Sequence, residues 1–168
     1  MRTFLRSLFW LALIVWLGSE VFFPIVAAVT FMTLMPDTHL AGTIVGSLLR
    51  ILHEIGLGAG VVALIVLAVA PTVRVFTSRA VIAPMVLLVA MIAGTAYSQF
   101  GIIPAMERDR IAAGGVIDAA PPNSPYRMDF NRLHMRSEYV EEGILLLGVL
   151  TVVLVSWADS RQGLVSRE

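Results

Sequence analysis

The sequence of 168 residues contains no cysteine. This absence excludes disulfides, thiolate metal sites, iron–sulfur clusters and cysteine nucleophiles. Lysine is absent as well, since all 12 basic residues are arginine, and this excludes lysine Schiff bases and the lysine-containing phosphate-binding loop. The 12 basic residues are matched by 12 acidic residues. The chain therefore lacks the basic excess with which proteins bind nucleic acid, and no nucleic-acid partner is expected.

Charged residues are scarce, at 14% of the chain, whereas apolar residues make up 58%. A soluble domain carries roughly 25% charged residues. Four apolar stretches reach the roughly 20 residues that a helix needs to cross a bilayer, at about residues 8–34, 51–73, 80–103 and 139–157. The sequence therefore predicts an all-α integral membrane protein, a four-helix bundle that forms a single transmembrane domain over residues 1–168.

The connection between the first two spans contains a helix start signal. Pro36 prevents the first helix from continuing, and Asp37 or Thr38 is a suitable N-cap. A helix from there to about Ala70 would be about 50 Å long, which exceeds the hydrocarbon thickness. We therefore expect a short interfacial helix up to about Arg50, or a break near residues 56–60, before the second span.

The connection between the third and fourth spans is the longest polar segment, residues 104–130. Residues 106–113 are able to extend the third span as a helix. Gly114 and Gly115, followed by Pro121, Pro122 and Pro125, are typical of an irregular loop. The sequence predicts a Pro/Gly-rich extracytoplasmic loop here.

The arginines at the ends of the spans indicate an orientation. Four spans bring both termini to one side of the membrane, together with the short link from Arg74 to Arg79. Because this link is basic, as is the N-terminus with Arg2 and Arg6, we expect a protein of the bacterial inner membrane with both termini on the cytoplasmic side. The alternative, a cleaved signal peptide, is disfavoured because the first apolar stretch is longer than a typical signal.

Small residues recur at a spacing that favours helix contact in membranes. Gly42 and Gly46 are four residues apart, as are Gly56 and Gly60. Such pairs let two helices approach closely. We expect these four glycines to serve helix packing.

Ionisable residues within the spans are the most informative feature, because charge in hydrocarbon is costly and is usually paired or functional. Glu20 lies about 18 Å into the first span at 1.5 Å per residue. Because successive spans run in opposite directions, spans two and four begin on the side away from the termini. The ionisable residues at the start of these two spans therefore lie in the same half of the membrane as Glu20. The candidate ligands of a cation in this cluster are Glu20, His53, Glu54, His134 and Glu138.

Three interpretations of these groups stay open. In the first, they are solvated at the interface or paired, for example Arg50 with Glu54 or with Glu20. In the second, glutamate and histidine hold protons or a divalent metal, for which Zn, Fe or Mn suits oxygen and imidazole ligands. In the third, His53 or His134 is an axial ligand of haem or of a chlorophyll-type pigment.

Short motifs in three places give a family resemblance: Trp16-Leu17-Gly18 with Phe22, Phe23 and Phe31; Ala41-Gly42 with Gly46; and Phe130-x-x-Leu133-His134-x-x-Ser137. With these motifs the chain resembles the transmembrane protein 205-like family, small four-span proteins whose bacterial relatives form a domain of unknown function. Members often carry Asn where this chain has Glu141 or Glu142, and Pro near Ala28. The resemblance implies a four-helix membrane bundle with His134 and Ser137 at shared positions, and it supplies no reaction.

The expected function is binding of a cation, a proton or a divalent metal, through the histidine–glutamate cluster in the outer half of the membrane, in transport, resistance or sensing. The alternative is a non-catalytic accessory subunit that docks on other membrane subunits through its glycines and its outer loop. A third interpretation is an enzyme that uses His134 and a carboxylate on a lipid or quinone. The lipid bilayer is the one partner common to all three.

Overall fold

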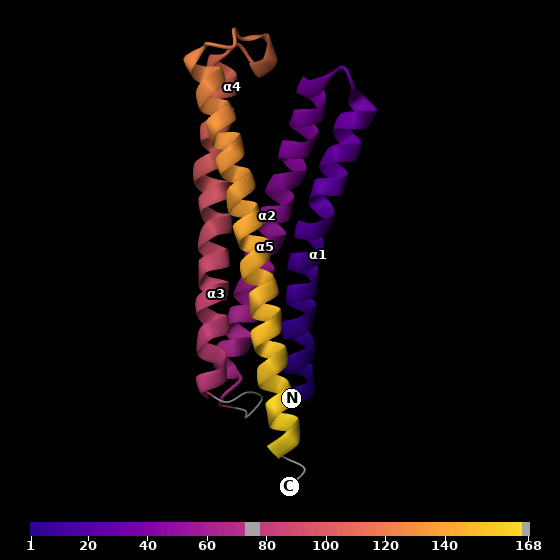
Figure 1. Cartoon of the computed structure of the whole chain (residues 1–168), viewed down its shortest axis with the longest axis vertical. Helices are drawn as coiled ribbons and strands as arrows, with labels where there is room; N and C mark the ends of the chain where they lie inside the picture. Colours follow the sequence, from indigo (N-terminus) through magenta and orange to yellow (C-terminus); the bar gives the residue numbers. More distant parts are fainter. Residues whose placement is uncertain (73–77, 166–168) are drawn as a thin grey trace.

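The computed structural model describes residues 1–72 and 78–165 (Figure 1). Most of the predicted link from Arg74 to Arg79 lies outside the described residues. The described chain is all-helical, in the order α1 (Arg2–Leu34), α2 (Thr38–Val69), α3 (Ser78–Tyr97), η1 (Ser98–Ile102), α4 (Ile103–Ala112), η2 (Ile117–Ala119) and α5 (Pro125–Val165). Four helical stretches are long and apolar enough to cross a membrane, at residues 2–34, 38–69, 80–112 and 125–158. The predicted all-α fold, with four helices that are long and apolar enough to cross a membrane, is confirmed.

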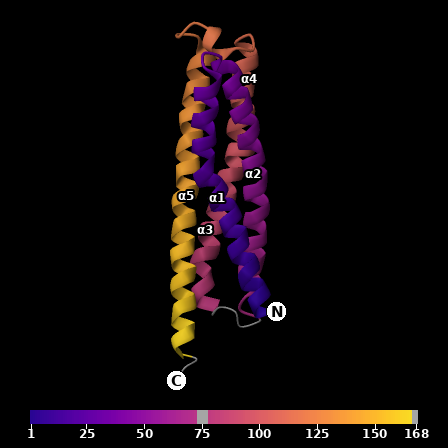
Figure 2. The same cartoon turned by 90° about the vertical axis from the view of Figure 1, so that its right-hand side faces the viewer.

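The helices form two long hairpins. α1 and α2 make the first, while α3 with α4 makes the second together with α5 (Figure 1). The hairpins pack together near the N-terminus and diverge toward the opposite end, where η2 lies. Seen from the side in Figure 2, all the long helices run along one axis, and the N-terminus lies at the same end as the last turns of α5. The N-terminus and the end of α5 therefore lie at one end of the bundle, as expected for four spans.

α2 begins where the sequence predicts and then continues without interruption. The Oδ1 atom of Asp37 accepts a hydrogen bond of 2.9 Å from the backbone N–H of Leu40, which is the geometry of an N-cap. The separate interfacial helix and the break near residues 56–60 are not found, because α2 is one helix of 32 residues. Its interior contains no proline, and Gly56 and Gly60 stay helical with an indole ring packed against them.

The second hairpin is longer than the hydropathy pattern suggests. α3, η1 and α4 follow one another without a gap, so the third span extends as a helix to Ala112, as expected. α5 begins at Pro125, earlier than the predicted residue 139, because proline is well suited to the first turn of a helix. The irregular loop is correspondingly short. It contains Gly114 and Gly115, whose φ angles of 91° and 94° favour glycine.

An apolar core fills the end of the bundle near the termini. Its largest members are fully or almost fully buried and come from all four long helices. They include Phe9, Leu13 and Trp16 of α1, Leu67 of α2, Leu88 and Met91 of α3, and Ile144 and Val155 of α5. This core ends at Trp16, and polar side chains begin immediately beyond it.

Candidate functional site: a buried histidine–carboxylate network

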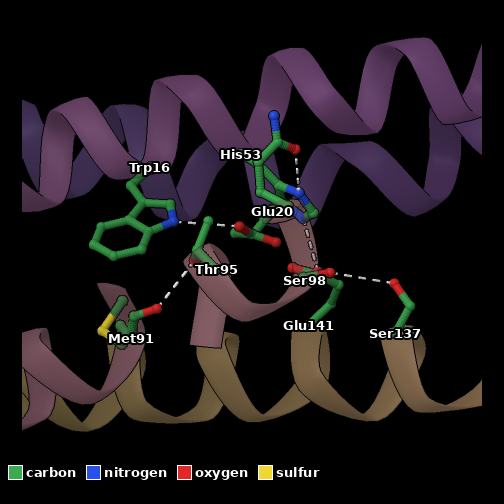
Figure 3. A network of polar contacts seen from close by, with 9 residues as sticks. Trp16, Glu20, His53, Met91, Thr95, Ser98, Ser137 and Glu141 are labelled. Carbon is green, nitrogen blue, oxygen red and sulfur yellow. Dashed lines mark hydrogen bonds and ion pairs between the residues drawn. The ribbon is translucent and has the colours of Figure 1, made fainter. Parts of the chain in front are cut away.

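His53 is the centre of a polar network at about the middle of the bundle. Its side chain has no exposed surface. The Nε2 atom lies 2.8 Å from Oε1 of Glu141, and the Nδ1 atom lies 3.1 Å from Oε1 of Gln99 (Figure 3). His53 thus joins α2 to both α5 and η1, and both of its ring nitrogens are engaged.

Glu141 collects further polar partners. Its Oε1 atom also accepts a hydrogen bond of 3.0 Å from the hydroxyl of Ser98. That hydroxyl lies 3.5 Å from the hydroxyl of Ser137, one turn before Glu141 on α5. The second carboxylate oxygen, Oε2, is buried and accepts no hydrogen bond from the described residues. Glu141 therefore keeps an unused acceptor inside the bundle.

Glu20 adds a second carboxylate from α1. Only 6% of its surface is exposed, and its Oε1 atom lies 3.3 Å from Nε1 of Trp16, which donates to it. Glu20 is close enough to interact electrostatically with both Glu141 and His53. Figure 3 shows it between Trp16 and His53. Three ionisable groups from three helices therefore meet in a buried place.

The π-helical turn η1 explains how two consecutive residues reach different helices. Ser98 contacts Glu141 of α5, whereas Gln99 contacts His53 of α2. A π-turn widens the helix by one residue and occurs frequently at functional sites. Here it brings two neighbouring polar side chains to the same network.

The structure brings together two of the five predicted cation ligands, Glu20 and His53. Glu54 is exposed, although it follows His53 directly. His134 and Glu138 pair with each other at 3.3 Å, and each side chain is 59% exposed. The predicted cluster is therefore divided between the buried network and outward-facing surfaces.

The two pairings expected of Arg50 are also absent. Within the described part of the chain, Arg50 forms no ion pair with Glu54 or with Glu20. It lies instead beside a cavity between α2 and α4.

The partners that complete the network were not among the predicted site residues: Trp16, Ser98, Gln99 and Glu141. A signal for Glu141 exists in the sequence. Ser137, Glu141, Ile144 and Gly148 recur at helical spacing, so they share one face of α5. Ser137 and Ile144 on this face are buried, whereas Glu138 and Glu142 belong to other faces and are exposed.

The predicted packing glycines differ in their surroundings. A Cβ atom at Gly56 or Gly60 would come within 2.5 Å of the ring of Trp16. One at Gly42 would meet only the ring of Phe31, at 4.0 Å, and one at Gly46 would meet nothing within that distance. The close helix contact is thus made at Gly56 and Gly60.

A metal site would need a different arrangement of the described side chains. Among the side chains of residues 1–72 and 80–158, no three His, Asp or Glu groups stand close enough to hold a metal ion. A histidine ligand also needs a ring nitrogen with a free lone pair. Both nitrogens of His53 lie within hydrogen-bonding distance of an oxygen.

Residues 11–111 match a protein family described as a domain of unknown function (DUF4149). The matched region includes Trp16, Glu20, His53 and the two polar residues of η1, and it ends before α5. No match to the chain was found among curated proteins or among solved structures.

Proposed function

The chain belongs to the DUF4149 family, and we propose that it is a multi-pass membrane protein that binds a proton at the network of Glu20, His53 and Glu141. The observation that carries this proposal is the pair of hydrogen bonds on His53, to Glu141 and to Gln99.

These two bonds can persist in both protonation states of the ring. Nε2 faces a carboxylate oxygen and so donates its hydrogen. When the ring is charged, Nδ1 donates to Oε1 of Gln99; when the ring is neutral, Nδ1 accepts from the amide NH₂ after a half-turn of the Gln99 amide. Because an amide offers a donor and an acceptor at nearly the same position, His53 gains or loses a proton with little rearrangement.

The charges around His53 also suit a proton. Two carboxylates that approach each other in a buried place repel when both are ionised, and a proton on one of them or on the histidine offsets that repulsion. Glu20 and Glu141 form such a pair, with His53 close to both. The unused Oε2 atom of Glu141 is a further position for a proton.

A divalent metal, the other cation expected from the sequence, would have to displace Gln99 or Glu141 from His53. The proton needs no such displacement. We therefore favour the proton for the wild-type site.

Nitrogen NMR of ¹⁵N-labelled histidine in the detergent-solubilised chain tests this proposal. The sequence has three histidines, and His53→Gln assigns the signal of the buried one. The ring nitrogen shifts of His53 should change with pH in the wild-type protein, and Glu141→Gln should alter them by removing the charged partner.

The exposed pair of His134 and Glu138 provides the matched control. Glu138→Gln also removes a carboxylate partner from a histidine, here an exposed one on the same helix, and it should affect His134 alone. A His53 signal that is constant over the whole accessible pH range, or that is indifferent to Glu141→Gln, would overturn the proposal.

The proposal includes a bacterial inner-membrane location with both termini in the cytoplasm. The basic N-terminus supports this orientation, because arginine favours the cytoplasmic side. Alkaline phosphatase fused to the C-terminus should therefore be inactive, and an active fusion would contradict the orientation.

The likeness to transmembrane protein 205-like proteins is part of the proposal too. Its support is the motif that leads into the fourth span, whose Ser137 lies next to Ser98 in the network. Docking as an accessory subunit stays a prediction, tested by whether a second protein co-purifies in fixed proportion in mild detergent.

A further inference from the structure

A cavity of about 340 Å³ lies on the far side of the network from the apolar core. It is lined by residues of α2, η1 and α4, namely Arg50, Gln99, Ile103, Pro104, Glu107 and Arg108. Arg50 lies one turn before His53 on α2, and Ile103 lies one turn after Gln99. The cavity therefore lies next to the network, on the side toward the start of α2 and the end of α4.

The cavity has uncompensated positive charge. Arg50 of α2 and Arg108 of α4 both line it, and neither forms an ion pair or a side-chain hydrogen bond within the described part of the chain. The acidic residue of the lining, Glu107, is held by Arg110 through two hydrogen bonds of 2.6 and 2.9 Å. Arg50 is near enough to Glu107 to interact electrostatically, but the carboxylate is already neutralised by Arg110.

We propose that this cavity binds an anion that carries a phosphate group. Two guanidinium groups facing one space match the oxygens of phosphate, since each offers a fork of N–H donors. Gln99 adds an amide at the inner end of the cavity, and Ile103 and Pro104 provide apolar walls. The phosphate comes either from a lipid headgroup or from free phosphate in solution.

This inference does not rest on the proposed proton site. The two sites share Gln99, but the arginines that recognise the anion make no contact with His53 or with either carboxylate of the network. Anion binding and histidine titration are therefore separate measurements, and each proposal can be overturned without the other.

Calorimetry on the full chain in maltoside micelles tests the inference. The probes are inorganic phosphate and dihexanoyl phosphatidic acid, with dihexanoyl glycerol as the uncharged control. We expect the phosphatidic acid to bind and the glycerol compound not to bind. Binding of inorganic phosphate as well would identify the free ion as sufficient, whereas binding of the lipid alone would identify the headgroup as the source.

Substitutions of the two lining arginines test whether the phosphate probes bind in this cavity. Arg50→Gln and Arg108→Gln should each weaken it about tenfold or more, as expected for loss of a charge-assisted contact. Arg132→Gln removes the same charge from an exposed arginine that pairs with Asp129 at 2.9 Å, and it should leave the affinity unchanged. Arg50→Lys and Arg108→Lys keep the charge and should retain part of the binding.

Two results would overturn the inference. One is that the wild-type chain binds neither phosphate probe. The other is that Arg50→Gln and Arg108→Gln, shown to be folded by gel filtration, bind as tightly as Arg132→Gln. If the glutamine variants do not fold, the wild-type measurement and the lysine variants decide the matter.

Discussion

The indole ring of Trp16 lies against the backbone of Gly56, so closely that a Cβ atom there would come within 2.5 Å of its Nε1 atom. The same ring meets Gly60 one turn later on α2, and Trp16 is fully buried. A rigid ring packed onto two glycines leaves no space for a side chain between α1 and α2.

Gly56→Ala and Gly60→Ala should therefore each destabilise the protein. An added methyl group has to push the buried ring aside, and overpacking of this kind costs about 1–3 kcal/mol. Thermal unfolding in detergent, followed by tryptophan fluorescence, measures the loss. Gly58→Ala is the control, because a Cβ atom there meets nothing within 4 Å. An unchanged melting temperature in Gly60→Ala would contradict the packing described.

Trp16→Phe should also lower the stability. Phenylalanine keeps part of the apolar contact but loses the hydrogen bond that Nε1 donates to Glu20. The carboxylate then stays buried without that donor, which costs about 1–3 kcal/mol. Trp10→Phe serves as the comparison, because Trp10 is half-buried and its ring packs edge-on against Phe9. Equal losses in the two variants would argue against a specific role of the Glu20 contact.

Glu141→Ala should destabilise the bundle, while Glu142→Ala should not. Removal of Glu141 leaves a fully buried histidine and the hydroxyl of Ser98 without their shared acceptor, at a cost of about 1–3 kcal/mol. Glu142 is exposed, and surface substitutions stay within about 0.5 kcal/mol. Denaturation of the two variants side by side tests whether neighbouring glutamates differ in this way.

Deletion of Phe100 should disturb the network while keeping the helix. Phe100 is exposed and lies in the π-turn, so its loss allows η1 to become ordinary α-helix. Ser98 and Gln99 then no longer reach Glu141 and His53 together. Circular dichroism should show unchanged helix content, and the ¹⁵N signals of His53 should move. Phe100→Ala keeps the chain length and should leave those signals in place.

Much of the fold follows from composition and local signals. Four apolar stretches of sufficient length predict four membrane-crossing helices, and Asp37 predicts the start of α2 because its carboxylate satisfies a free backbone N–H. The helix ends beyond the apolar stretches are harder to predict. Hydropathy reports only the part of a helix that is apolar, so the polar residues 125–138 give no such signal although α5 begins at Pro125 rather than at residue 139.

The site could be predicted only in part. Depth along the chain identifies Glu20 and His53, because ionisable groups in apolar helices need partners. The choice among Glu138, Glu141 and Glu142 depends on the rotation of α5, which the neighbouring helices decide. Gln99 reaches His53 through a π-turn, and hydrophobic periodicity carries no sign of the residue that such a turn adds.

The polar network contains one ionisable or amide side chain from each of the four long helical stretches. Apolar helices in lipid can shift along their axes or rotate with little change in the apolar surface that they bury. Apolar packing alone therefore does not select a single alignment of the helices. The contacts among Glu20, His53, Gln99 and Glu141 form in one alignment only. A shift of one helix by one turn would leave a carboxylate in the apolar interior without its polar partners, which is costly. The same side chains that would bind a proton thereby also determine how the four long helices are aligned.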